Sequence, residues 1–189
     1  MNIQEIVSRL EEGNSRFVAD KLDGKFQDSS RRDELVKGQQ PHTIVLSCAD
    51  SRVVPELTFD AGLGELFVVR VAGNVANTSS IASIEYAVAH CGSQVIVVLG
   101  HQSCGAVTAA VAGGDNGPNL NHLLGHINPA IKAAPEGALV NDIVKVNACM
   151  SVEDLQSKSV ILKEAVDAGK IKIIPAYYNL DSGKVDLLS

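Results

Sequence analysis

Aromatic side chains are scarce in this chain of 189 residues: four Phe, three Tyr and no Trp make up 4% of the sequence. A core built mainly on large rings is therefore excluded, and Val, Ile, Leu and Ala must fill it. Hydrophobic residues reach 46% and charged residues 20%, the balance of an ordinary globular protein. The length is sufficient for one domain with a substantial core.

The chain also lacks any apolar run that approaches the ~20 residues needed to span a bilayer. Its first residues, MNIQEIVSRLEEG, carry acidic side chains and have neither the basic start nor the apolar block of a secretory signal. We therefore expect a cytoplasmic protein that has no membrane partner. In that compartment the four cysteines are expected to be thiols or metal ligands rather than disulfides.

Positive charge is not in excess, because 16 Lys and Arg against 22 Asp and Glu give a formal net charge of −6. Proteins that bind nucleic acid through a broad surface normally show a basic face, so no nucleic-acid partner is expected. The charge balance says little about small substrates, and a small-molecule substrate stays open.

The apolar pattern predicts strands that alternate with helices. Apolar residues at helical spacing predict an amphipathic helix over residues 2–20, with Gly13-Asn14 as a candidate interruption. Short β-branched runs bounded by turn residues predict strands. The expected strands are 43–47, 65–71, 94–100, 170–177 and 184–188, and the later helices are expected to end at Gly92, to run from 103 or 104 to 113, and to cover 119–134 and 139–168.

The inner strands are apolar on both faces, which is typical of a parallel sheet covered by helices on both sides. We therefore predict an α/β fold with a mostly parallel central sheet flanked by helices and a C-terminal edge hairpin. No linker or repeat interrupts the chain, so residues 1–189 are expected to form a single domain. Within it we expect an N-terminal helical arm over about residues 1–35 and a metal-binding core over about residues 40–189.

Two expected strands end in unusual residues. The strand 94–100 is followed by His101-Gln102-Ser103-Cys104, and the spacing of His101 and Cys104 at a turn into a helix lets both side chains reach one ion. A thiolate at Cys104 would also be stabilised by the helix dipole. Sites in open α/β sheets form beyond the carboxyl ends of the strands, which is where these residues lie.

The strand 43–47 leads into Cys48-Ala49-Asp50-Ser51-Arg52. If the chain stays extended there, Cys48, Asp50 and Arg52 alternate and point the same way. Two thiolates with one imidazole favour zinc over magnesium or calcium, and two Cys and one His with an open fourth position form a known type of catalytic zinc site. Asp50 could fill the fourth position, or accept a hydrogen bond from a zinc-bound water while Arg52 keeps it off the metal. The plainer alternative is a pair of buried thiols beside a structural Asp50–Arg52 ion pair.

Taken together, three blocks resemble the β-class carbonic anhydrases: CADSRV at 48–53, RVAGN at 70–74 and GHQSCG at 100–105. The resemblance implies one Zn²⁺ per chain, held by Cys48, His101 and Cys104, with Asp50 and Arg52 as a catalytic dyad. It also implies a homodimer, in some members assembled further to a tetramer or higher, with active sites at the interface and the N-terminal helix packed over the partner.

The resemblance further implies residues of the carbon dioxide pocket: Gln39, which would reach into the partner's site, and Phe67, Ala72, Tyr86 and Gly105. Some members hold a regulatory bicarbonate in a Trp–Arg–Tyr pocket. Here Arg70 and Tyr178 match the Arg and Tyr, whereas Val45 stands at the Trp position, so inhibition of that kind is not expected.

The expected reaction is the reversible hydration of carbon dioxide to bicarbonate and a proton, by a zinc-bound hydroxide that Asp50 orients and Arg52 supports. The resting site should be open, with water on zinc; a closed form with Asp50 on zinc remains an alternative at low pH. Three competing functions also stay open. They are hydrolysis of carbonyl sulfide or carbon disulfide at the same site, sulfur transfer with Cys104 as a metal-free nucleophile, and zinc binding without turnover.

Histidines and cysteines outside these blocks suggest less. His122 and His126 are four residues apart on an expected helix, but no nearby acid or cysteine completes a ligand set, so a helix surface is expected. Cys91 and Cys149 stand in apolar helical contexts and are expected to be core thiols.

Overall fold

A computed structural model describes all residues from 1 to 189. Five strands form one sheet in the order β2-β1-β3-β4-β5, in which the first four are parallel and β5 pairs antiparallel with β4. This confirms the predicted mostly parallel sheet and its C-terminal hairpin. The strands are β1 (Thr43–Ser47), β2 (Leu66–Arg70), β3 (Val95–His101), β4 (Lys172–Tyr178) and β5 (Val185–Leu187).

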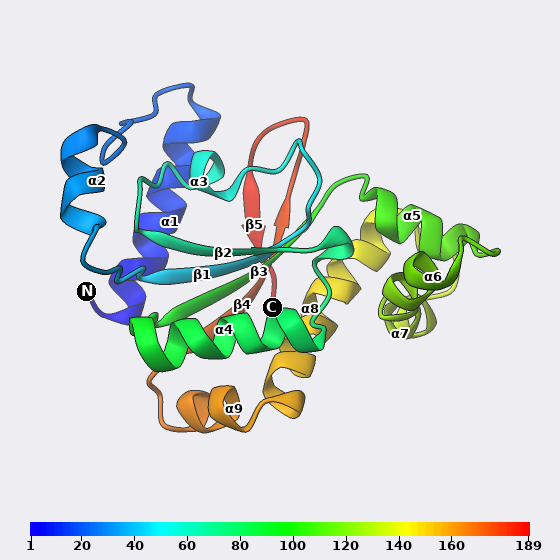
Figure 1. The fold of residues 1–189 in the computed structure, drawn as a ribbon. Helices are drawn as coiled ribbons and strands as arrows, with labels where there is room; N and C mark the ends of the chain where they lie inside the picture. The colour runs from blue at the N-terminus through cyan, green and yellow to red at the C-terminus, as the bar shows by residue number, and fades with distance from the viewer.

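Helices cover both faces of the sheet and one of its ends (Figure 1). α1 (Ile3–Val18) packs on one face, whereas α4 (Thr78–Cys91), α8 (Val140–Lys158) and α9 (Val160–Asp167) cover the other. α5 (Gly105–Ala112), α6 (Pro118–Gly125) and α7 (Asn128–Ala133) gather beyond the carboxyl end of β3. Three further short helices lie in connections: α2 (Ser29–Leu35), α3 (Pro55–Thr58) and the 3₁₀ turn η1 (Ala72–Asn74). None of the helices is both long and apolar enough to cross a membrane.

The burial of each strand agrees with its position in the sheet. All residues of β1 and β3 are buried, as expected for the middle of a sheet covered on both sides. β2 lies at the edge, and its residues are half-buried or exposed. The stretch 139–168, expected to be largely helical, forms two helices divided at Ser159, whose hydroxyl accepts a hydrogen bond from the Leu162 N–H and so caps the second helix.

The Gly13-Asn14 pair does not interrupt α1, so that prediction is wrong. Both residues are buried where α1 packs against the segment that contains Thr58 and Phe59. A Cβ atom at Gly13 would lie 2.0 Å from the carbonyl oxygen of Phe59, so only glycine allows this approach. The Asn14 side chain donates to the carbonyls of Thr58 and Gly183 at 3.1 and 2.9 Å and accepts from the Val185 N–H at 2.8 Å.

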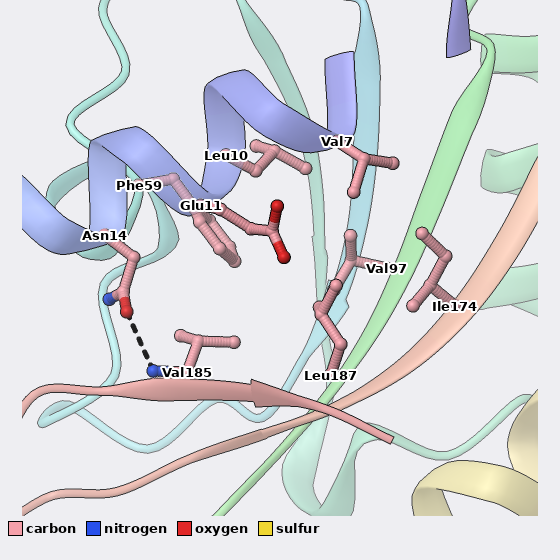
Figure 2. Close-up of a pocket in the computed structure, with 9 residues that line it drawn as sticks. All are labelled: Val7, Leu10, Glu11, Asn14, Phe59, Val97, Ile174, Val185 and Leu187. Atoms are coloured by element: carbon pink, nitrogen blue, oxygen red, sulfur yellow. Dashed lines mark hydrogen bonds between the residues drawn. The ribbon is translucent and has the colours of Figure 1, made fainter. Parts of the chain in front are cut away.

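Beside Asn14, a small apolar cavity lies between α1 and the sheet (Figure 2). Val7 and Leu10 face it from the helix, and Val97 and Ile174 face it from β3 and β4, with β5 along one side. The hydrogen bond from Val185 to Asn14 lies at its end. The first and the last elements of the chain are therefore joined around one small cavity.

Candidate metal centre

β1 and β3 are neighbours in the sheet, and Ser47 of β1 is in register with Leu99 of β3. Cys48 follows β1 directly, His101 ends β3, and Cys104 is the N-cap of α5. All three side chains are buried, and their ligand atoms lie within 4.8 Å of one another. The two motifs, far apart in the sequence, thus meet in one cluster, as the strand-end argument predicts.

His101 presents one ring nitrogen to the cluster. Its Nδ1 lies 2.9 Å from the carbonyl oxygen of Gln102, and a carbonyl can only accept, so Nδ1 carries the proton. Nε2 is therefore a lone-pair acceptor, yet it is buried and has no hydrogen-bond partner. A buried, unpartnered imidazole nitrogen beside two thiols fits a bound transition metal, and a hydrogen bond at the other nitrogen is the usual support of a metal-ligating histidine.

The two thiols have opposite pKa shifts. A hydrogen bond with Cys104 lowers the pKa of Cys48, and the Gly73 N–H, which lies 3.3 Å from the Cys48 Sγ, lowers it further. The same hydrogen bond and burial raise the pKa of Cys104. The cluster thus stabilises one thiolate by its own hydrogen bonds, and a bound cation would stabilise the second. Two thiolates and one imidazole are a donor set that suits zinc.

Asp50 lies beside this cluster but bonds to Arg52. Its oxygens accept from the Arg52 Nε at 2.9 Å and the Arg52 Nη2 at 2.7 Å, while Oδ2 is 3.9 Å from the His101 Nε2. The hydrogen bond with Arg52 holds the pKa of the Asp50 carboxyl well below its usual range. The carboxylate is therefore charged at neutral pH and is oriented as an acceptor next to the ligands.

The expected extended path from Cys48 to Arg52 is wrong in its second half. The chain turns at Ser51, because the Asp50 Oδ1 accepts from the Arg52 N–H at 3.0 Å and the Asp50 carbonyl accepts from the Val53 N–H at 3.0 Å. An Asp side chain that bonds the backbone two residues later is a common turn former. Arg52 consequently reaches Asp50 by folding back, not by lying on the same side of a strand.

Arg70, at the end of β2, braces this turn. Its Nε donates to the carbonyl of Cys48 at 3.0 Å, and its Nη2 donates to those of Asp50 and Val53 at 2.7 and 2.9 Å. Sequence reasoning matched Arg70 to a bicarbonate pocket and missed this role. The other two positions of that pocket are buried here, Val45 completely and Tyr178 to 5% exposure, with the Tyr178 ring 6.5 Å from that of Phe17.

The expected pocket residues lie in three separate places. Ala72 precedes Gly73, and Gly105 follows Cys104 as the first residue of α5, so both adjoin the cluster along the chain. Phe67 and Tyr86 lie together on β2 and α4, with ring centroids 6.3 Å apart, at the half-exposed edge of the sheet. Gln39 is exposed and lines a separate hollow with Arg32, Leu35 and Leu63. One chain alone therefore does not bring Gln39 into the cluster.

The remaining His and Cys candidates stay outside the centre. His122 is exposed near the end of α6, and its ring lies 5.3 Å from that of the half-buried His126. Cys91 is buried and Cys149 half-buried, and all four cysteines of the chain are free thiols. Neither these two histidines nor these two cysteines join a group of three potential metal ligands.

A protein-family model described as carbonic anhydrase matches residues 43–185, and the similar solved structures are β-carbonic anhydrases. The chain belongs to the β-class carbonic anhydrases. It is therefore an enzyme of the lyase class, a carbonate dehydratase. The family is zinc-dependent, which agrees with the donor set of the cluster.

Individual relatives agree over almost the full length of this carbonic anhydrase. Carbonic anhydrase 2 of Mycobacterium tuberculosis is 37% identical over 184 residues, which cover 94% of this chain and 89% of the relative. The carbonic anhydrase of Mycolicibacterium smegmatis is 38% identical over 186 residues, covering 95% and 90%. The β-carbonic anhydrase of Coccomyxa, solved in complex with acetazolamide, has a TM-score of 0.77 at 28% identity, covering 96% of this chain and 86% of its own. The β-carbonic anhydrase CcaA has the same fold, with a TM-score of 0.79 at 24% identity, covering 97% and 95%.

Proposed function

We propose that this carbonic anhydrase hydrates carbon dioxide reversibly at one zinc ion held by Cys48, His101 and Cys104, with Asp50 and Arg52 as the catalytic dyad. The observation that carries the proposal is the buried, unpartnered Nε2 of His101 between two thiols and an arginine-paired carboxylate. A zinc ion, when bound, lowers the pKa of a water molecule and thereby supplies the nucleophile.

The residues of the chain orient the reaction. Asp50 is charged and has no proton to give, so it accepts a hydrogen bond from the attacking water and directs the remaining lone pair at carbon dioxide. Arg52 donates to both carboxylate oxygens and so would keep Asp50 from ligating a bound zinc ion. Arg70 keeps the turn that carries both residues in place through three backbone carbonyls.

The test is stopped-flow hydration of carbon dioxide between about pH 6.5 and 9, with zinc per chain measured on the same samples. Wild-type protein should contain one zinc per chain and turn over faster as the pH rises. Asp50→Asn should lower kcat by about 10²-fold or more and keep its zinc, because a neutral amide is a weaker acceptor and pairs poorly with Arg52. Asp115→Asn, which changes an exposed loop carboxylate elsewhere, should match the wild type.

Three results would contradict this proposal. Unchanged turnover in Asp50→Asn would remove Asp50 from the mechanism. Zinc that survives replacement of His101 by Ala would remove that ligand from the proposal, with His122→Ala, at an exposed histidine outside the cluster, as the control. Bound zinc without hydration at any pH would reject carbon dioxide as the substrate. Carbonyl sulfide and carbon disulfide would then be assayed at the same site.

We further propose a homodimer that forms across the edge of the sheet at β2. The outer side of β2 has no neighbouring strand, and Val54, Leu57, Ala61, Leu63 and Leu66 line one open hollow beside it. A solved pair of β-carbonic anhydrases from Sordaria macrospora is described as tetrameric. Burying this edge in a second copy would protect an otherwise open strand and bring the exposed Gln39 to a neighbouring site.

Analytical ultracentrifugation tests the dimer. Leu57→Glu places a charge in the hollow beside β2 and should shift the protein towards monomer, whereas Leu120→Glu, at a similarly exposed leucine of α6, should not. A monomeric wild type at micromolar concentration would refute the assembly.

The chain is also proposed to work in the cytoplasm, since four free thiols, two of them in the metal cluster, suit a reducing compartment. Fractionation of the source cells should find the protein with cytoplasmic markers, and recovery outside that fraction would reject the assignment.

A further inference from the structure

The backbone between His101 and Cys104 is held in an unusual conformation. Ser103 has a φ of 55°, in the left-handed region that non-glycine residues rarely adopt. This conformation is unfavourable for a residue that carries a side chain, and it persists where surrounding contacts fix it. Ser103 is exposed, so tight packing around its side chain is not what holds it. Hydrogen bonds of its main chain are therefore the contacts that can fix this conformation.

A side chain of α8 holds this turn. Asn141, the second residue of the helix, accepts a hydrogen bond from the Ser103 N–H at 2.9 Å through its Oδ1. That N–H belongs to the peptide group whose carbonyl is that of Gln102, the acceptor for the Nδ1 proton of His101 at 2.9 Å. One rigid, planar peptide therefore connects Asn141 to the imidazole ring. A peptide that donates at its N–H is also a better acceptor at its carbonyl.

The same turn reaches the dyad. The carbonyl of Ser103 accepts from the Arg52 Nη2 at 3.3 Å, and this is the nitrogen that also bonds the Asp50 Oδ2. The orientation of Ser103 thus bears on the imidazole of His101 through one of its peptides and on the guanidinium of Arg52 through the next. Both effects depend on the Ser103 N–H being fixed by Asn141.

We propose that Asn141 is a positioning residue of the metal centre, which sets the ring plane of His101 and the placement of Arg52 by fixing the Gln102–Ser103 peptide. The inference rests on the proposed zinc ligands. Asn141 touches neither metal nor substrate. Loss of a partner that orients a metal-ligating histidine typically lowers metal affinity by about 10–100-fold, and removing the partner of that partner should fall at the lower end.

The experiment compares metal affinity, the visible spectrum of the Co²⁺-substituted protein and kcat in a set of variants. Asn141→Leu keeps the size of the side chain and removes the acceptor, and it should weaken zinc binding about 10-fold in chelator competition, alter the Co²⁺ spectrum and lower kcat with little change in KM. Asn141→Asp retains an acceptor oxygen and should stay close to the wild type in zinc affinity and in the Co²⁺ spectrum.

Two further variants separate positioning from stability. Asp142→Ala removes the neighbouring cap of α8, in which the Asp142 Oδ2 accepts from the Leu139 N–H at 3.0 Å, so it should lower thermal stability and leave the Co²⁺ spectrum unchanged. Ser103→Gly relieves the backbone strain, so added to Asn141→Leu it should restore part of the zinc affinity.

An Asn141→Leu protein with wild-type zinc affinity and Co²⁺ spectrum would overturn the inference, as would equal spectral changes in Asp142→Ala. Because metal binding and its spectrum are measured without carbon dioxide, the comparison decides the role of Asn141 even if hydration itself is not found. A wild type that binds no metal would instead reject the proposed function and this inference together.

Discussion

Gly73→Ala tests how tightly the backbone around Cys48 is built. Gly73 has a φ of 73°, and its N–H donates to the Cys48 Sγ while its carbonyl accepts from the Asn147 Nδ2 at 2.9 Å. The backbone is held on both sides and cannot rotate freely to accommodate a side chain. A Cβ at this position would lie 2.9 Å from the Cδ1 of Ile127, a fully buried residue.

Two costs add in this variant. Placing alanine in the left-handed region costs about 1–2 kcal/mol, and forcing a methyl group against a packed side chain costs about 1–3 kcal/mol. The free energy of unfolding should therefore fall by about 2–5 kcal/mol, which for a chain of this size lowers Tm by roughly 4–20 °C. Zinc affinity should fall as well, because any shift of Gly73 moves the hydrogen bond on the thiolate.

A second substitution isolates the steric part. Ile127→Val deletes the Cδ1 atom and alone should cost about 0.5–1.5 kcal/mol. In the double variant the crowding is relieved while the backbone strain remains, so urea unfolding should give at least about 1 kcal/mol less destabilisation than the sum of the single changes. A Gly73→Ala protein within about 0.5 kcal/mol of the wild type, with unchanged zinc affinity, would refute the reasoning.

Two more perturbations follow from contacts described above. Asn14→Ala removes three hydrogen bonds of a buried side chain and should lower the free energy of unfolding in urea by about 3 kcal/mol, whereas the exposed Ser15→Ala should change it by less than about 0.5 kcal/mol; equal effects would contradict the joining role of Asn14. Because Arg52 lowers the pKa of Asp50, this pair adds stability above the unfolded pKa of about 3.9 and loses it as the pH falls through the folded value. The difference in unfolding free energy between wild type and Asp50→Asn should thus stay constant from about pH 5 to 8 and shrink below about pH 4, and a change between about pH 6 and 8 would contradict it.

The strands and the metal cluster could be predicted because their signals are local. A continuous β-branched run such as 94–100 is typical of a buried strand. Strand ends in a parallel sheet meet at one edge, so Cys48 and His101 could be expected to lie close together. That residues 1–189 form a single domain stays a prediction. It agrees with the structure in that α1 shares a core cluster with β3 and β4.

The errors and omissions concern contacts between segments far apart in the sequence. Gly and Asn have low helix propensity, so Gly13-Asn14 suggested an interruption. In the structure Asn14 instead bonds Thr58 and Val185 and so fixes α1 to the rest of the chain. The turn at Asp50 competes with extension through a single side-chain hydrogen bond, which periodicity does not detect. Asn141 is 38 residues from Ser103 and carries no motif, so only the packed structure reveals the contact.

The joining of α1 to the last hairpin has a consequence for the order of folding during synthesis. Asn14 and Val185 are 171 residues apart, so α1 leaves the ribosome long before its partner exists. At roughly 5–20 residues per second, about 10–30 s pass before the Asn14 side chain can bond Val185. The strands β1, β2 and β3 can pair in that interval, and the final hairpin of β4 and β5 then completes the surface on which the first helix docks. The earliest element made is thus the last to be secured, and a chain that stops short of residue 183 would leave it loose.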